Sequence, residues 1–262
     1  MSDCEIVHVA IASPDTIDAG LVRNVAGIIN KSPYDTRLLL ARDIPKVIGH
    51  YNDVKTAESI IQNLKALGLI AIALGDSELR KTPQIFKVQT LEFQEKEVLF
   101  KDSRNHEHRI GRNDVFLILE GRIQTSSEIE TTKTKTKLNL AATLLTGGIP
   151  VTRRVNVKTV SRSTQLEYFA RVYTRKSSDP IWEILQYHVN YSFLGTSMAL
   201  SSSLTNFNAM IVKLREMFPQ AIFDDRLVKL LGVNASSSLV SEDTERSCKL
   251  IYLLYLAKAS LS

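Results

Sequence analysis

The chain has 262 residues, 44% of them hydrophobic and 23% charged, and a formal charge of +5, an ordinary globular composition that excludes a long disordered chain. Its two cysteines, Cys4 and Cys248, cannot build a disulfide framework or, by themselves, a zinc site. No apolar run reaches the roughly 18 to 20 residues of a membrane span, and Asp3 and Glu5 stand where a secretory leader would be basic. We therefore expect a cytoplasmic protein without a transmembrane segment.

Residues 1–78 are predicted to form a small α/β module. Alternating apolar residues indicate its first strand, and apolar residues three and four apart indicate its helices. Ser32 is placed to cap the second helix, Pro45 to end it, and Gly68 to end the third. The expected order is strand (5–12), helix (about 21–29), helix (from 32 to before 45), short strand (47–48), helix (about 53–67) and strand (69–74).

Two stretches of this module, Pro45-Lys46-Val47 and the run from Ala57-Glu58 to Leu64-Lys65-Ala66-Leu67-Gly68, carry a family resemblance. Together with the order of elements, they resemble the C-terminal domain of the bacterial ribosomal stalk protein, and the adaptor ClpS has a similar fold. The resemblance implies a bacterial-type module that binds protein without catalysis. ClpS recognises an N-terminal residue with acidic and Asn groups after its first strand, where this chain has only Asp15. The alternative is a unit that simply packs on the rest of the chain.

Residues 84–220 are predicted to form an antiparallel β-rich domain closed by a helix, which makes the whole chain an α+β protein. Two-residue alternation indicates strands within 86–100 and over 114–123, 166–173 and 181–188. An amphipathic helix over 205–218 ends before Pro219 and is expected to cap the sheet. In layout alone, this domain resembles pleckstrin-homology-like folds.

Residues 221–262 are expected to form a helical C-terminal segment, with a short helix at 227–231 and a final helix from Ser241. The final helix is apolar on more than one side. We expect it either to pack in the core of this chain or to contact a partner or a second copy of the chain.

The strongest anomaly of composition lies in a predicted insertion at 124–165. No acidic residue occurs between Glu130 and Glu167. Seven cations lie between them: Lys133, Lys135, Lys137, Arg153, Arg154, Lys158 and Arg162. Without these seven, the charge of +5 becomes −2, so the basic character of the protein is local. The insertion is therefore the predicted contact region for an acidic protein or an anionic surface.

Other interpretations of the insertion stay open. An apolar helix beginning near Leu138, beside the cations, could dock on an anionic membrane surface. Nucleic acid is a weaker candidate, because the aromatic residues that stack on single-stranded bases are absent. Alternatively, a flexible Lys/Thr linker leads into a helix that fills the core.

The sharpest enzyme-like signal is Gly75-Asp76-Ser77-Glu78-Leu79, which follows an apolar strand, together with Gly111-Arg112-Asn113-Asp114. These stretches resemble the first and third blocks of GDSL-type serine hydrolases. The resemblance would make Ser77 the nucleophile, with Gly111 and Asn113 as oxyanion donors. The Asp-x-x-His block of that family is missing, and both stretches are also common turns. The hydrolase is therefore the enzyme alternative and not the main prediction.

No cofactor or metal site is predicted. His106 and His108 are too few for a zinc site and are expected in a solvated loop, and neither cysteine has neighbours that would lower its pKa. The glycine pattern of nucleotide-binding loops is absent. The sequence therefore predicts a non-catalytic scaffold or adaptor.

Overall fold

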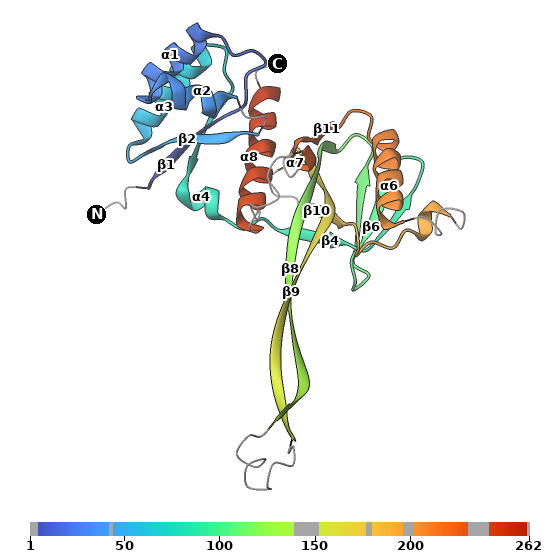
Figure 1. The fold of residues 1–262 in the computed structure, drawn as a ribbon. Coiled ribbons are helices and arrows are strands. Elements are labelled where there is room, and N and C mark those ends of the chain that lie inside the picture. The colour runs from blue at the N-terminus through green and yellow to red at the C-terminus, as the bar shows by residue number, and fades with distance from the viewer. Residues whose placement is uncertain are drawn as a thin grey trace. The chain divides into compact units, whose positions relative to one another are not determined.

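The computed structural model describes residues 5–41, 44–138, 152–176, 180–195, 202–229 and 241–260, and for 124–165 and 241–243 it describes the backbone only (Figure 1). The chain divides into two compact units. The larger unit consists of Met1–Ile123 and Glu167–Ser262, and the smaller unit is Gln124–Leu166.

The first elements of the larger unit have the predicted order. They are β1 (Val7–Ile11), α1 (Ala19–Ile29), α2 (Pro33–Leu40), β2 (Lys46–Tyr51), α3 (Val54–Ala66) and β3 (Ala71–Gly75). β1 is the central strand of an antiparallel sheet in the order β2-β1-β3. The side chains of Asp18, Ser32 and Asp53 accept hydrogen bonds from backbone N–H groups at the starts of the three helices.

These helices pack on the sheet because each has one apolar face. Val25 of α1, Leu40 of α2 and Leu64 of α3 are all at most 1% exposed and share a cluster with Val9 of β1. Gly68 has φ +78°, so the third helix ends at a residue in the left-handed region, as its sequence predicts. The βααβαβ order is confirmed.

A β-rich region follows. Its elements are α4 (Asp76–Arg80), β4 (Ile85–Val88), β5 (Thr90–Phe93), β6 (Glu97–Lys101), β7 (Glu107–Gly111), β8 (Val115–Leu138), β9 (Thr152–Thr174), β10 (Ile181–Leu185), the 3₁₀ turn η1 (Ser192–Leu194), α6 (Ser203–Met217), β11 (Ile222–Asp225), α7 (Arg226–Lys229) and α8 (Ser241–Ala259). The strands form one sheet in the order β11-β8-β9-β10-β4 and another in the order β5-β6-β7. The α+β class is confirmed, and two parallel pairs, β10 with β4 and β11 with β8, join the antiparallel ones.

Helices α6 and α8 pack on opposite faces of the five-stranded sheet, because alternate strand residues contact different helices. Ile118 of β8 shares a cluster with Phe207 and Met210 of α6. Leu117 and Leu119 share another with Ile251 of α8. The fully apolar run at the start of β8 is therefore a strand buried on both faces.

The final helix, α8, also contacts the N-terminal elements. Leu250 packs with Ala10 of β1, Leu74 of β3 and Leu79 of α4. The apolar sides of α8 are thus covered within this chain, which favours core packing over contact with a partner. Because Leu250 joins α8 to β1 and β3, residues 1–78 and α8 belong to the same compact unit.

The structure corrects three local predictions. The segment 221–262 is not wholly helical, because Ile222–Asp225 is a strand that pairs with β8. Gly75-Asp76-Ser77 is not a turn, because helix α4 begins at Asp76. The flexible linker is wrong for 124–137, which belongs to the strand β8. Frequent Thr, Val and Ile favour extended structure there and in the matching part of β9.

The helix predicted from Leu138 falls mainly on 139–150, which lies outside the described residues. None of the helices in the described part of the chain is long and apolar enough to cross a membrane.

Candidate functional site

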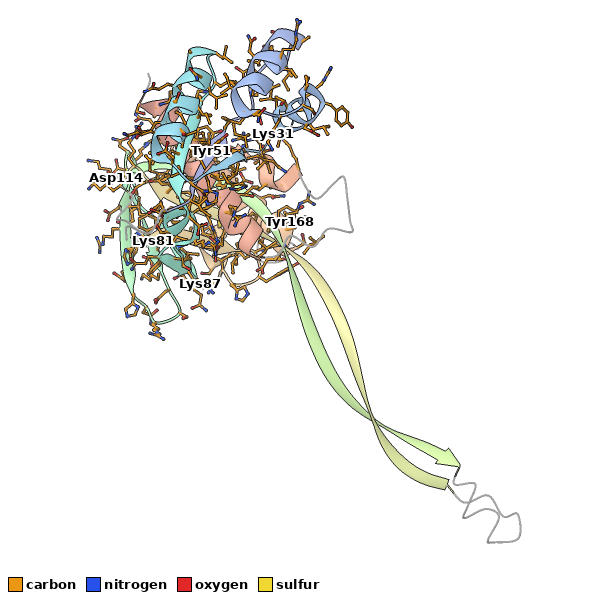
Figure 2. All side chains as sticks on the ribbon, turned by 90° about the vertical axis from the view of Figure 1, so that its left-hand side faces the viewer. Lys31, Tyr51, Lys81, Lys87, Asp114 and Tyr168 are labelled. Atoms are coloured by element: carbon orange, nitrogen blue, oxygen red, sulfur yellow. The ribbon has the colours of Figure 1, made fainter. Side chains whose placement is uncertain are left out.

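The seven cations of the predicted contact region all lie in two neighbouring strands. Lys133, Lys135 and Lys137 belong to β8, and Arg153, Arg154, Lys158 and Arg162 belong to β9. β8 and β9 are hydrogen-bonded neighbours, and they run side by side in both Figure 1 and Figure 2. We call Gln124–Leu138 and Thr152–Leu166 the basic ribbon. The structure therefore places on two neighbouring strands residues that lie up to 29 positions apart in the sequence, from Lys133 to Arg162.

The spacing of these cations suits a strand. Alternate positions of a strand belong to the same face, so Lys133, Lys135 and Lys137 fall on one face of β8. Arg154, Lys158 and Arg162 are separated by four residues, an even number, and fall on one face of β9. Each of these two sets of cations thus occupies positions of one face of its strand.

The outer edges of the basic ribbon have no strand beside them in the described residues. β11 pairs with β8 only over Leu117–Leu119, and β10 pairs with β9 only over Phe169–Val172. Both stretches lie outside the ribbon. Unpaired strand edges expose backbone donors and acceptors, and lysines on such edges oppose uncontrolled pairing between chains.

The neighbourhood of Ser77 does not reproduce a serine-hydrolase site. The Ser77 hydroxyl donates to Glu5, not to a histidine. Strand β3, which precedes Ser77, pairs antiparallel with β1, whereas the GDSL resemblance needs a parallel strand. Gly111 ends β7 in a different sheet, where its backbone N–H donates to the Asp114 carboxylate over 3.1 Å. Among the described residues, no hydrogen bond joins Ser77 to a histidine.

In a second polar cluster, which no local sequence pattern marks, two histidines meet. His8 and His50 are opposite each other on β1 and β2, and their Nδ1 atoms lie 2.7 Å apart. His8 Nε2 lies 3.0 Å from Asp76, and Arg80 holds the other oxygen of that carboxylate at 2.7 Å. When His8 donates its Nε2–H to Asp76, its Nδ1 accepts from His50, so the carboxylate sets the tautomers of both rings.

The environment of this cluster favours the ionised form of Asp76 and the neutral form of His50. Hydrogen bonds from His8 and Arg80 lower the pKa of Asp76. Partial desolvation of this exposed ring, followed by the neighbouring His8, Lys31 and Arg246, lowers the pKa of His50. The cluster therefore combines a carboxylate with a neutral imidazole at pH 7.

A third cluster surrounds Arg171 of β9, which is 4% exposed. Its Nε donates to Glu183 of β10 over 2.9 Å, and its Nη1 donates to Glu245 of α8 over 2.7 Å. Burial alone would lower the pKa of Arg171, but the hydrogen bond to Glu245 and nearby negative charge raise it, so Arg171 stays charged. Beside it, burial raises the pKa of the Cys248 thiol to about 12, which leaves this cysteine protonated and unreactive.

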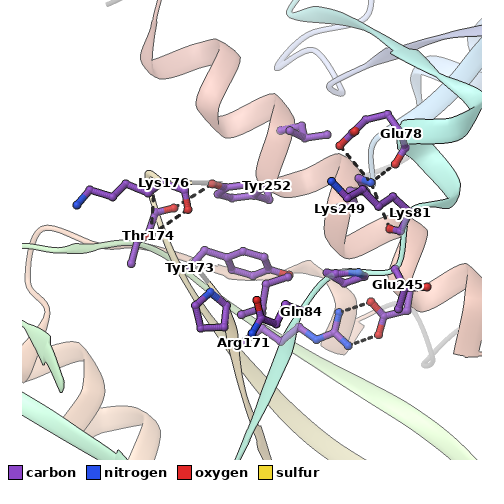
Figure 3. A pocket seen from close by; sticks show the side chains of 15 residues that line it. Glu78, Lys81, Gln84, Arg171, Tyr173, Thr174, Lys176, Glu245, Lys249 and Tyr252 are labelled. Carbon is purple, nitrogen blue, oxygen red and sulfur yellow. Dashed lines mark hydrogen bonds and ion pairs between the residues drawn. The ribbon is translucent and has the colours of Figure 1, made fainter. Parts of the chain in front are cut away.

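A pocket of about 350 Å³ lies next to Arg171 (Figure 3). Its lining comes from α4 and the segment after it, from the end of β9, from the start of β10 and from α8. The lining residues are Glu78, Lys81, Thr82, Pro83, Gln84, Arg171, Tyr173, Thr174, Lys176, Pro180, Ile181, Glu245, Lys249, Tyr252 and Leu253. Nothing in the local sequence marks this pocket, because its four segments meet only in the fold.

The remaining candidates for metal chemistry are separated. His106 Nδ1 lies 2.8 Å from Asp102 in the β6–β7 turn. His108 lies in β7, not in a solvated loop, and its ring packs 4.4 Å from that of Phe86. The described residues contain no group of three or more His, Cys, Asp or Glu side chains that could hold a metal ion.

No protein-family model, curated protein or solved structure matches the chain. The ribosomal stalk, ClpS-like and pleckstrin-homology-like resemblances therefore stay predictions.

Proposed function

We propose that this chain is a non-catalytic binding protein and that the basic ribbon is its contact with an acidic protein partner. One observation carries the proposal. Seven cations and no acidic residue occur in 131–166, and all seven cations lie on two paired strands. Clustered like charges attract a polyanion from a distance and orient it as it approaches.

The open edges of the ribbon support a protein as the partner. An extended acidic segment could add to an edge through backbone hydrogen bonds, while its carboxylates meet the lysines and arginines of the ribbon. Single-stranded nucleic acid would gain less, because none of the ribbon positions is aromatic.

The first experiment compares two charge variants in affinity purification from the native cell, with nuclease added to the lysate. The test variant replaces Lys133, Lys135 and Lys137 with Gln. The control replaces the exposed lysines Lys65, Lys87 and Lys96 of the larger unit with Gln, which removes the same charge elsewhere. We expect an acidic protein to be recovered with the wild type and the control but lost with the test variant.

Direct titration then separates the classes of partner. The purified full chain is titrated with the recovered protein, with duplex DNA and with phosphatidylserine vesicles over a range of salt concentrations. We expect the recovered protein to bind most tightly, with an affinity that falls as salt rises. Tighter binding to DNA or to vesicles, or equal binding by the test variant and the wild type, would contradict the proposal.

A further inference from the structure

The pocket beside Arg171 contains a buried hydroxyl that forms no well-aligned hydrogen bond. Tyr173 is 3% exposed, and its hydroxyl has no partner of good geometry within the described residues, although the Arg171 guanidinium and the Cys248 thiol lie close to it. Other polar groups around it are engaged: the Tyr252 hydroxyl donates to the Thr174 carbonyl over 3.0 Å, and Arg171 binds two carboxylates. A buried hydroxyl without a well-aligned partner destabilises a folded protein, so its retention points to a role outside folding.

The wall beside this hydroxyl is aromatic and apolar. The rings of Tyr173 and Tyr252 stack with centroids 4.8 Å apart and planes at 20°. Four apolar residues complete the lining: Pro83, Pro180, Ile181 and Leu253. A wall of this kind, with a few polar groups on it, suits the flat body of a small organic molecule.

The charges that remain unpaired around the pocket are positive. Arg171 is neutralised by Glu183 and Glu245, and Lys249 lies 3.5 Å from the carboxylate of Glu78. Lys81 and Lys176, by contrast, form no ion pair among the described residues. Figure 3 shows these two lysines on opposite sides of the Tyr173–Tyr252 pair. An anion entering from either side therefore meets a cation that has no competing carboxylate in the described part of the chain.

We propose that this pocket binds a small organic anion with a flat apolar body. The ring of the ligand packs on the aromatic wall, its acidic group faces Lys81 or Lys176, and one of its oxygen atoms accepts a hydrogen bond from the Tyr173 hydroxyl. Burial raises the pKa of Tyr173, so the hydroxyl keeps its proton and acts as a donor at neutral pH. The site is independent of the basic ribbon.

The first test uses three probes with the same ring and different charge: benzoate, phenyl phosphate and neutral benzyl alcohol. Amide chemical shifts of the full chain are followed by NMR. We expect saturable binding of at least one anion, at least about tenfold tighter than benzyl alcohol, with shifts at 171–176 and 245–253. The tighter of the two anions identifies a carboxylate or a phosphate ligand. The proposal would be overturned if neither anion saturated the protein below roughly 10 mM. It would also be overturned if the chemical-shift changes were confined to other segments.

A second test uses single substitutions. Tyr173→Phe is expected to weaken binding of the better anion about tenfold and to leave Tm unchanged or raised, because it removes a hydroxyl that has no well-aligned partner in the free protein. Tyr34→Phe, at a residue that is 72% exposed, is the matched control. A lower Tm of Tyr173→Phe with unchanged affinity would mean that the hydroxyl is structural. Unchanged affinity in both Lys81→Gln and Lys176→Gln would show that the pocket does not select anions.

Discussion

At the scale of single residues, the buried charges are the most informative feature. Arg171 and Glu183 each interrupt an apolar strand, and they are direct cross-strand partners on β9 and β10. With Glu245 from α8, whose side chain is 35% exposed, they form a group of one cation and two carboxylates around the buried Arg171. Removing one partner of such a group leaves a charge without compensation inside the protein, which costs much more than the group contributes when complete.

Replacement of Arg171 with Met tests this group. We expect Arg171→Met to lower the free energy of unfolding by about 3–5 kcal/mol, because Glu183 and Glu245 would remain close together without a cation. The double variant Arg171→Met/Glu183→Gln should recover part of this loss. The measurement is urea unfolding at neutral pH, and a loss below about 1 kcal/mol for the single variant would contradict the buried arrangement.

The histidine pair predicts a loss of stability on acidification. Partial desolvation, followed by the His8 ring and the positive charges of Lys31 and Arg246, places the pKa of His50 below the usual value of 6.5. Below pH 6.5 the unfolded chain therefore takes up a proton at His50 before the folded chain does, and stability falls. The lowered pKa of Asp76 adds a second loss, which begins as the pH falls towards its usual value of 3.8.

The His50→Gln variant isolates the first of these losses. Its urea midpoint should fall less than that of the wild type between about pH 7.5 and about pH 5.5, because Gln does not titrate. The comparison is made within each protein, so a constant difference in stability between the two does not affect it. Equal falls in both proteins would show that His50 makes no contribution.

At the scale of elements, α8 is the helix on which the larger unit most depends. One side of it packs on the five-stranded sheet through Ile251, and another packs on β3 and α4 through Leu250. Its weak amphipathic pattern is a consequence, because a helix covered on two sides needs apolar residues on both.

Shortening a fully buried side chain of α8 tests its contribution. Ile251 is 0% exposed, so Ile251→Ala should lower the free energy of unfolding by about 2–5 kcal/mol through lost burial and a new cavity. Arg246→Ala, at an exposed position of the same helix, should change it by less than about 0.5 kcal/mol. Chemical unfolding of both variants makes the comparison, and similar effects would argue against the packing described for α8.

At the scale of the whole molecule, the division into two units predicts that the basic ribbon is separable from the larger unit. In a shortened chain, Gln124–Leu166 is replaced by an Asn-Gly turn that joins Ile123 to Glu167. Gly121 of β8 lies against Phe169 of β9, so a two-residue hairpin turn suits this junction. The larger unit, Met1–Ile123 and Glu167–Ser262, holds four clusters of packed apolar side chains. We therefore expect the shortened chain to keep a cooperative thermal transition within a few degrees of the wild type, measured by circular dichroism. Loss of that transition would show that the ribbon is needed for folding.

Local signals were sufficient for much of the architecture. Helix caps, the stop at Gly68 and the spacing of apolar residues predicted the βααβαβ order of the first elements, because these signals act within one or two turns of the chain. The strand β11 was missed because Ile222–Asp225 is short and contains two aspartates, and only pairing with β8 makes it a strand. The sequence of the ribbon does not distinguish a strand from a linker, because Lys-Thr alternation fits either a strand or a solvated loop.

The position of the positive charge and the identity of many helices and strands follow from local sequence, since both depend on residues that are neighbours in the chain. Tertiary structure alone decided that His8 meets His50, that Arg171 lies between two glutamates from other elements, and that Tyr173 shares a pocket with α8. These contacts join residues 12 to 79 positions apart. The order of strands and the placement of α8, not any local pattern, bring them within reach of one another.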